Sequence, residues 1–305
     1  MLERVRPVLL IGDGEDGSCV TGDEEDFSLR FEGAPADSPQ WSGAKRWTLS
    51  RAGTVRCDGE DFKVSPETGL VCDGRVYRLA DNDVQYTADV PLGHGNSGEV
   101  WPGVLLQRRA SGLSAPGISR PPVAIKVVRV EAPSAKEQLL NEIRGLILAQ
   151  ECPNLLKLYG GFVSRGTGAV HIVMELMDLG SLQDLQMQLN GQGAPEDKLA
   201  CIGVQVFKGL VHLHDKCRVI HRDVKPANIL INSQGAVKLS DFGISKALRS
   251  PVTKLPGYAP KTGTPAGTRL YMSPERCSCE EYSFECDIWS CTTCDPEVLQ
   301  LICRE

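Results

Sequence analysis

Apolar residues recur at helical spacing in two long segments of the chain. The apolar positions are Leu139, Leu140, Ile143, Leu146 and Ile147 in the first segment, and Leu199, Ile202, Val206, Leu210 and Leu213 in the second. Because residues three and four apart share one face of an α-helix, each segment is predicted to be a helix with one buried face. Ser134 followed by Glu137 has the spacing of a capping box and predicts the start of the first helix.

Shorter apolar runs, separated by Gly- and Asp-containing turns, predict β-hairpins near the N-terminal end. These runs are Trp47-Thr48-Leu49, Thr54-Val55-Arg56, Phe62-Lys63-Val64, Leu70-Val71-Cys72 and Arg75-Val76-Tyr77. They form either a small β module or a strand-rich segment that packs on the following domain, and the sequence leaves both possibilities open. Residues 1–85 are therefore expected to be an acidic region, partly disordered and then rich in hairpins.

A cluster of polar residues surrounds another predicted hairpin. The apolar runs at 229–231 and 237–239 flank a polar turn, so the chain folds back on itself. Asn228 and Asp241 then emerge at the same end of the hairpin, where an amide and a carboxylate can share a divalent cation with phosphate oxygens. Asp223 lies close by in the sequence and is available to a substrate hydroxyl.

Composition and charge narrow the possible classes of protein. The 305 residues carry a formal net charge of -6, with 41% hydrophobic and 24% charged residues, which fits a soluble protein of one large or two smaller domains. The acidic balance disfavours nucleic acid or an anionic membrane as the main partner. No apolar run approaches the roughly 18 residues of a membrane-spanning helix, and the run Val8–Ile11 is too short for a signal peptide. We therefore expect a cytoplasmic protein, with a nuclear location as the alternative.

The 12 cysteines are expected to be mostly free thiols, as in other proteins of reducing compartments. Six of them are concentrated near the C-terminal end: Cys277, Cys279, Cys286, Cys291, Cys294 and Cys303. The spacings Cys277-x-Cys279 and Cys291-x-x-Cys294 leave a zinc site as an alternative, although such a site would need a compact fold of its own.

Four motifs, by their order along the chain, carry a resemblance to protein kinases. His221-Arg222-Asp223-x-Lys225-x-x-Asn228, with Asp241-Phe242-Gly243 after it, resembles the catalytic loop and metal-binding motif. Leu92–Val100 fits the glycine-rich loop G-x-G-x-x-G-x-V, and Val123–Lys126 fits the V-A-I-K strand. A plain glycine turn or a strand-edge lysine is the alternative for each motif alone, but the order of the motifs argues against it. The resemblance implies an α+β, bilobal kinase-like domain over 86–305, with a β-rich N-lobe at 86–176 and an incomplete, mainly helical C-lobe at 177–305.

The resemblance also implies a binding site for ATP and Mg²⁺. The residues expected to contact the nucleotide are Leu92, Gly93, Gly95, Asn96, Ser97, Gly98, Val100, Ala124, Lys126, Met174, Glu175 and Met177. Glu142 is the expected ion-pair partner of Lys126, with Glu137 as the near rival on the same helix. Asn228 and Asp241 would hold the metal ion, Asp223 would accept the proton of the substrate hydroxyl, and Lys225 would stabilise the transferred phosphoryl group.

Within the kinases, the chain looks most like the MAP kinase kinases, which phosphorylate Thr and Tyr in a MAP kinase activation loop. Lys225 points to Ser/Thr chemistry, and the segments 267–276 and 177–182 agree with this group. A MAP kinase substrate and an upstream MAP kinase kinase kinase are the implied partners, with Thr264 as the favoured activating phosphorylation site. Thr268 would bridge Asp223 and Lys225.

Two further segments suggest regulation. Arg4-x-Arg6 followed by Leu9-x-Ile11 has the layout of a MAP kinase docking peptide, with an ordinary exposed chain as the alternative. Arg108-Arg109-x-Ser111 has the layout that basic-directed kinases favour.

The resemblance stops after Ser290, where Pro296 interrupts the position of a core helix. The arginine that pairs with the family's equivalent of Glu275 is missing, so we expect a shortened gene product or a fragment. The alternative functions are an inactive kinase that acts as a docking protein, and a Ser/Thr kinase of a neighbouring class.

Overall fold

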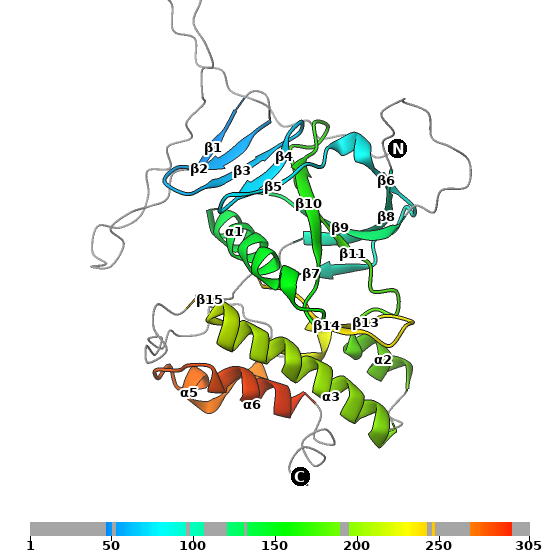
Figure 1. Ribbon diagram of the computed structural model, residues 1–305, viewed down its shortest axis with the longest axis vertical. Helices are drawn as coiled ribbons and strands as arrows, with labels where there is room; N and C mark the ends of the chain where they lie inside the picture. Colours follow the sequence, from blue (N-terminus) through cyan, green and yellow to red (C-terminus); the bar gives the residue numbers. More distant parts are fainter. Residues whose placement is uncertain are drawn as a thin grey trace, which may run out of the picture.

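The computed structural model of the chain describes residues 47–50, 53–95, 98–106, 121–130, 133–189, 195–242, 246–247 and 269–294. Several predicted features lie outside these residues, namely the docking segment at 4–11, Asn96, Ser97, Ser111, Gly243, Thr264, Thr268 and Pro296. The described elements form a β-rich upper lobe and a mainly helical lower lobe, so the predicted α+β, bilobal fold is confirmed (Figure 1).

The larger sheet of the upper lobe has the strand order β10-β11-β9-β8-β6, with β7 paired to β8. Its strands are β6 Val84–Tyr86, β7 Gly93–Gly95, β8 Gly98–Leu105, β9 Pro122–Val128, β10 Leu158–Val163 and β11 Val170–Glu175. Each pairing is antiparallel, and Lys126 of β9 lies opposite Val100 of β8 and Ile172 of β11. The V-A-I-K segment is therefore a central strand, as predicted.

A second sheet precedes it in the sequence. The strands β1 Trp47–Leu49, β2 Val55–Cys57, β3 Phe62–Ser65, β4 Gly69–Cys72 and β5 Arg75–Tyr77 follow one another as an antiparallel meander. The predicted hairpins are confirmed, and the open alternative is resolved because the buried side chains of this sheet belong to the same core cluster as those of helix α1 and strand β10. Cys72 is fully buried in β4, and this burial, with Asp73 beside it, raises the pKa of the thiol to about 12.

Helix α1, Pro133–Leu148, lies below the five-stranded sheet and beside the larger one (Figure 1). All five of its predicted apolar positions are buried. The helix begins at Pro133, earlier than the start predicted from Ser134, whose side chain lies outside the described part of the chain. Proline favours the first helical position because its fixed φ suits the helix and it has no N–H to leave without a partner. Short 3-10 turns lie at Asp81–Asp83 and Ala149–Glu151.

The lower lobe is built on helix α3, Glu196–Val211, which continues into a wider helical turn at His212–Cys217. The other helices are α2 Leu182–Gln188, α5 Pro274–Cys277 and α6 Glu285–Thr293. Ser181 caps α2 and pairs with Asp184 in a capping box, as the sequence indicates. Among the described helices, none combines the length and apolar character that crossing a membrane would need.

The segment between α3 and α5 carries the predicted catalytic motifs. Its elements are β12 Val219–Ile220, the 3-10 turn Pro226–Asn228, β13 Ile229–Ile231, β14 Val237–Leu239 and β15 Lys246–Ala247. β13 and β14 pair antiparallel, which confirms the predicted hairpin, and β15 pairs with β12. The ten described cysteines are free thiols, and the described residues contain no group of His, Cys, Asp and Glu arranged to hold a metal ion, so the zinc alternative gains no support.

Asp287 of α6 holds the catalytic loop from below. Its carboxylate is fully buried and accepts hydrogen bonds from the backbone N–H groups of His221 and Arg222, each at 2.7 Å. The Nε2 atom of His214 lies 2.9 Å from the same carboxylate. Arg222 has a left-handed backbone with φ 69, a conformation that a non-glycine residue keeps only when its surroundings fix it. Through these contacts, the start of α6 anchors the catalytic loop.

Asp287→Ala would leave two backbone N–H groups and His214 without an acceptor in the core. We expect the free energy of unfolding to fall by about 3 kcal/mol, measured by urea denaturation. Ile288→Ala, at a partly exposed position on the same helix, is the control and should change it by about 0.5 kcal/mol. Equal losses in the two variants would contradict the anchoring role of Asp287.

Candidate active site

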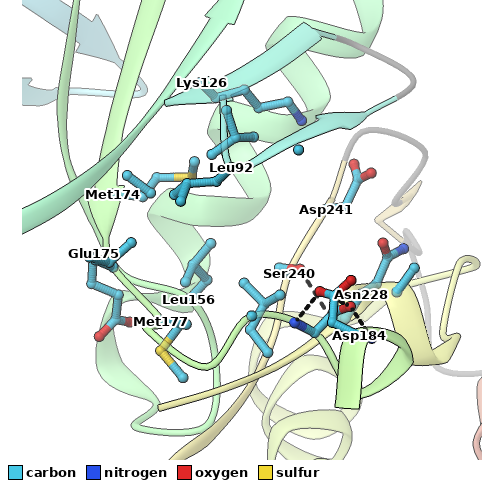
Figure 2. A pocket seen from close by; sticks show the side chains of 18 of the residues that line it. Leu92, Lys126, Leu156, Met174, Glu175, Met177, Asp184, Asn228, Ser240 and Asp241 are labelled. Carbon is cyan, nitrogen blue, oxygen red and sulfur yellow. Dashed lines mark hydrogen bonds between the residues drawn. The ribbon is translucent and has the colours of Figure 1, made fainter. Parts of the chain in front are cut away.

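A cavity of about 320 Å³ lies between the lobes. Most of the residues predicted to bind nucleotide and metal line it (Figure 2). Those that line it are Leu92, Gly93, Val100, Ala124, Lys126, Glu142, Met174, Glu175, Met177, Asn228 and Asp241. Gly95 and Gly98 pair with each other across the β7–β8 hairpin. The glycine-rich hairpin, the β9 strand, helix α1 and the β13–β14 hairpin thus meet at one place.

Lys126 and Glu142 form a buried ion pair between β9 and α1. The Nζ atom of Lys126 lies 2.5 Å from Oε1 of Glu142, and the two side chains are only 7% and 3% exposed. Burial disfavours the ammonium ion, but the negative charges of Glu142 and Asp241 outweigh this effect, so the pKa of Lys126 is raised above its ordinary value. This contact confirms Glu142 as the partner predicted for Lys126, and the rival residue Glu137 is exposed.

Asp223, Lys225 and Asn228 form a hydrogen-bonded cluster, in which Asn228 lines the cavity and Asp223 and Lys225 do not. The amide nitrogen of Asn228 donates to the backbone carbonyl of Asp223 at 2.8 Å and to its carboxylate at 2.9 Å. The ammonium group of Lys225 donates to the same carboxylate oxygen at 2.8 Å. The Asp223 carboxylate is therefore fixed between an amide and a cation, and the amide oxygen of Asn228 takes no part in these bonds.

Asp241 directs its side chain into the cavity, between Lys126 above and Asn228 below (Figure 2). Its backbone is left-handed with φ 63, which turns the chain sharply between Ser240 and Phe242. His221 stabilises this turn, because its Nε2 lies 3.0 Å from the Ser240 carbonyl and its ring packs on Phe242. The motif thus places a carboxylate in the cavity and an aromatic ring in the core.

The oxygen atoms of Asn228 and Asp241 are of the kind that a hard divalent cation such as Mg²⁺ prefers. These oxygen atoms belong to a neutral amide and a carboxylate at adjacent ends of the β13–β14 hairpin, and both residues line the cavity. A protein site with few carboxylates fits Mg²⁺ bound together with phosphate oxygens, because this ion keeps several ligands that are not protein groups.

In the segment that joins the two lobes, the Glu175 carboxylate is bonded to groups outside the cavity. The Glu175 carboxylate accepts hydrogen bonds from the backbone of Lys157 at 2.6 Å and from the ammonium group of Lys238 at 2.8 Å. Figure 2 shows this carboxylate pointing away from the cavity centre. Contacts to a base would therefore use backbone groups of Glu175 and Met177, as the sequence implies.

Sequence reasoning missed several cavity residues. They are His94, Leu146, Leu156, Leu176, Gly180, Ser181, Gln183, Asp184, Ala227, Leu230 and Ser240. Leu230 could have been found, because Ile229 and Ile231 are buried and strand alternation places Leu230 on the opposite face. Leu156 and Ser240 come from loops, and no periodic pattern marks them.

Comparison with known proteins agrees with this geometry. Residues 86–300 match the protein kinase domain family. The chain is also 38% identical over 167 residues to mitogen-activated protein kinase kinase 1 of Arabidopsis thaliana, and the match covers 55% of this chain and 44% of that protein. The aligned part therefore spans less than half the length of this relative. Since the family match covers most of the chain and the motifs surround one cavity, the chain belongs to the protein kinase family, and it is similar to a MAP kinase kinase.

Proposed function

We propose that this chain transfers the terminal phosphoryl group of Mg-ATP to a hydroxyl group of a protein substrate. The buried Lys126–Glu142 pair, which faces Asp241 across the cavity, is the observation that carries the proposal. A buried cation beside two carboxylates is stable in the protein, and an incoming polyphosphate supplies further negative charge to this cation.

The cavity walls match the parts of the nucleotide. Val100 and Ala124 provide apolar surfaces for the base, while the backbone of Glu175 and Met177 provides polar groups at its edge. The ammonium group of Lys126 is held by Glu142 at the position where the α and β phosphates would lie. The ion pair therefore fixes the nucleotide relative to the catalytic loop.

Asn228 and Asp241 would hold Mg²⁺, which when bound neutralises charge on the phosphate oxygens. Asp223 orients the substrate hydroxyl and accepts its proton, and the contacts of its carboxylate with Lys225 and Asn228 keep it in place for this step. The Lys225 ammonium group stabilises the negative charge on the moving phosphoryl group. Positioning and electrostatics supply most of the catalysis.

The substrate we propose is a MAP kinase, phosphorylated on Thr and Tyr of its activation loop in a cytoplasmic signalling cascade. The identity to a protein named mitogen-activated protein kinase kinase 1 supports this choice. A MAP kinase kinase kinase is the proposed upstream partner, with Thr264 as the site that it phosphorylates.

The deciding experiment incubates the full chain with Mg-ATP and a MAP kinase whose own catalytic lysine is replaced. Mass spectrometry should find phosphate on both Thr and Tyr of the substrate's activation loop, and Asp223→Asn should abolish it. Phosphate on other proteins alone would identify a kinase of a neighbouring class. ATP binding without any transfer would identify a docking protein.

Glu142→Gln removes the charge that fixes Lys126, and Lys126→Met removes the cation itself. We expect each variant to lower kcat/KM by about 100-fold in the same assay, because the phosphates lose their positioned counter-charge. Glu137→Gln is the matched control, since Glu137 is an exposed carboxylate on the same helix. Activity of Glu142→Gln equal to that of this control would contradict the role of the ion pair.

Helix α1 also contacts the Asp-Phe-Gly motif directly. Phe242 is fully buried, and its ring packs so closely on Gly145 that a Cβ atom at this position would overlap the Phe242 side chain. Since Asp241 precedes Phe242, the position of the metal-binding carboxylate depends on this contact. The absence of a side chain at Gly145 allows α1 and the motif to approach closely.

Gly145→Ala should displace Phe242 and with it Asp241. We expect the free energy of unfolding to fall by about 2 kcal/mol despite the better helix propensity of alanine, with a larger KM for Mg-ATP. Thermal unfolding and ATP titration measure the two effects. Gly166→Ala, in a turn where an added Cβ has space, is the control. An unchanged KM for Mg-ATP in Gly145→Ala would contradict the proposed coupling.

A further inference from the structure

The turn between β4 and β5 presents a carboxylate to helix α1. Asp73 and Gly74 both have a left-handed backbone, with φ 47 and 74, which is the geometry of a two-residue hairpin turn. Asp61 supports the turn by accepting hydrogen bonds from the N–H of Asp73 at 2.9 Å and from that of Gly74 at 2.5 Å. The Asp73 carboxylate is therefore held at a defined place on the sheet.

Arg144 of α1 joins this turn to a second one. Its guanidinium group donates two hydrogen bonds to Asp73, each at 3.1 Å, and one to Glu60 at 2.6 Å. The Arg144 side chain is 28% exposed, so solvent screens the network only in part. The guanidinium group thus donates two hydrogen bonds to one carboxylate and a third to another. This arrangement fixes its orientation better than a single surface ion pair does.

An arginine of the sheet also holds the C-terminal end of α1. The guanidinium group of Arg75 donates a hydrogen bond to the backbone carbonyl of Ile147 at 3.1 Å. Ile147 is the penultimate residue of α1, where carbonyl groups have no partner within the helix. A cation at this end also interacts favourably with the helix dipole. The sheet thus contacts α1 at its last two turns.

Arg144 and Glu142 lie on different sides of α1. Two residues along a helix correspond to a rotation of about 200°, so the two side chains point in nearly opposite directions. Glu142 meets Lys126 of β9, and Arg144 meets the turns of the five-stranded sheet. A rotation of α1 that broke the contacts of Arg144 would therefore also move Glu142.

On the side of the catalytic loop, α1 borders a cavity of about 610 Å³. Its walls include Asp73 and Arg75 of the sheet, Arg144 of α1 and Arg222 of the catalytic loop. Among the described residues, this space separates part of α1 from the lower lobe, whereas Gly145 packs closely on Phe242. The orientation of α1 then depends more strongly on its contacts with the sheet.

We propose that the five-stranded sheet at residues 47–77 is a positioning module for the catalytic site, and that Arg144 is the positioning residue through which it holds Glu142 against Lys126. This inference rests on the proposed function, because the ion pair matters for phosphoryl transfer.

The test compares variants of the full chain by hydrogen exchange and by phosphoryl transfer. Arg144→Glu should increase the exchange rates of the α1 amides by about tenfold and lower kcat by a similar factor. Arg144→Lys keeps the positive charge but cannot reproduce the two parallel hydrogen bonds to Asp73, so it should have a smaller effect. This variant keeps the test decisive if Arg144→Glu does not fold. Arg165→Glu is the matched control, because it breaks an exposed ion pair with Glu67 of the same sheet and does not involve α1.

A charge exchange provides the rescue. The double variant Glu60→Lys/Asp73→Asn should show the same faster α1 exchange and lower kcat as Arg144→Glu. Combining these two changes with Arg144→Glu should restore both the slow exchange of the α1 amides and kcat. Asparagine is chosen at position 73 because it tolerates the left-handed backbone there.

Two results would overturn the inference. One is α1 exchange in Arg144→Glu equal to that in Arg165→Glu. The other is a uniform loss of protection in all elements with normal kcat per folded molecule, which would make the sheet merely stabilising. If the unmodified chain transferred no phosphate, the proposed function would fail, and the α1 exchange rates would still decide whether Arg144 and the sheet hold the helix.

Discussion

The active arrangement of this molecule depends on one buried ion pair, between Lys126 of β9 and Glu142 of α1. Two charges removed from water are stable only when each has the other in close contact. The strand is fixed by its neighbours in the larger sheet, whereas the helix could rotate or shift. The structure therefore has to determine the position of α1, and several independent contacts do so.

These contacts come from three directions. The apolar face of α1 packs in the core with residues of both sheets, and Gly145 receives the ring of Phe242. Arg144 and the C-terminal turn are held by the five-stranded sheet. Below, Asp287 fixes the backbone of the catalytic loop, and His221 connects that loop to the turn containing Asp241. The positions of the ion pair, Asn228 and Asp241 are thus set by one continuous network.

Local patterns predicted much of this fold and site. The hairpins at 47–77 and 229–239, the buried face of α1 and the Lys126–Glu142 pair depend on strand alternation, helical spacing and motif order. The predicted start of α1 at Ser134 was too late, since the helix begins at Pro133 and proline favours the first helical position. The partners of Arg144 could not be predicted, since they lie 71 and 84 residues away and no local rule pairs them. The same holds for cavity residues such as Leu156 and Ser240, which loops bring in.

The burial of Cys72 has a practical consequence. While β4 stays in the sheet, its thiol is covered and, with a pKa of about 12, is almost never ionised at neutral pH. Only the thiolate reacts readily with alkylating reagents. The rate at which Cys72 is alkylated would therefore report opening of this sheet, directly and without any introduced label.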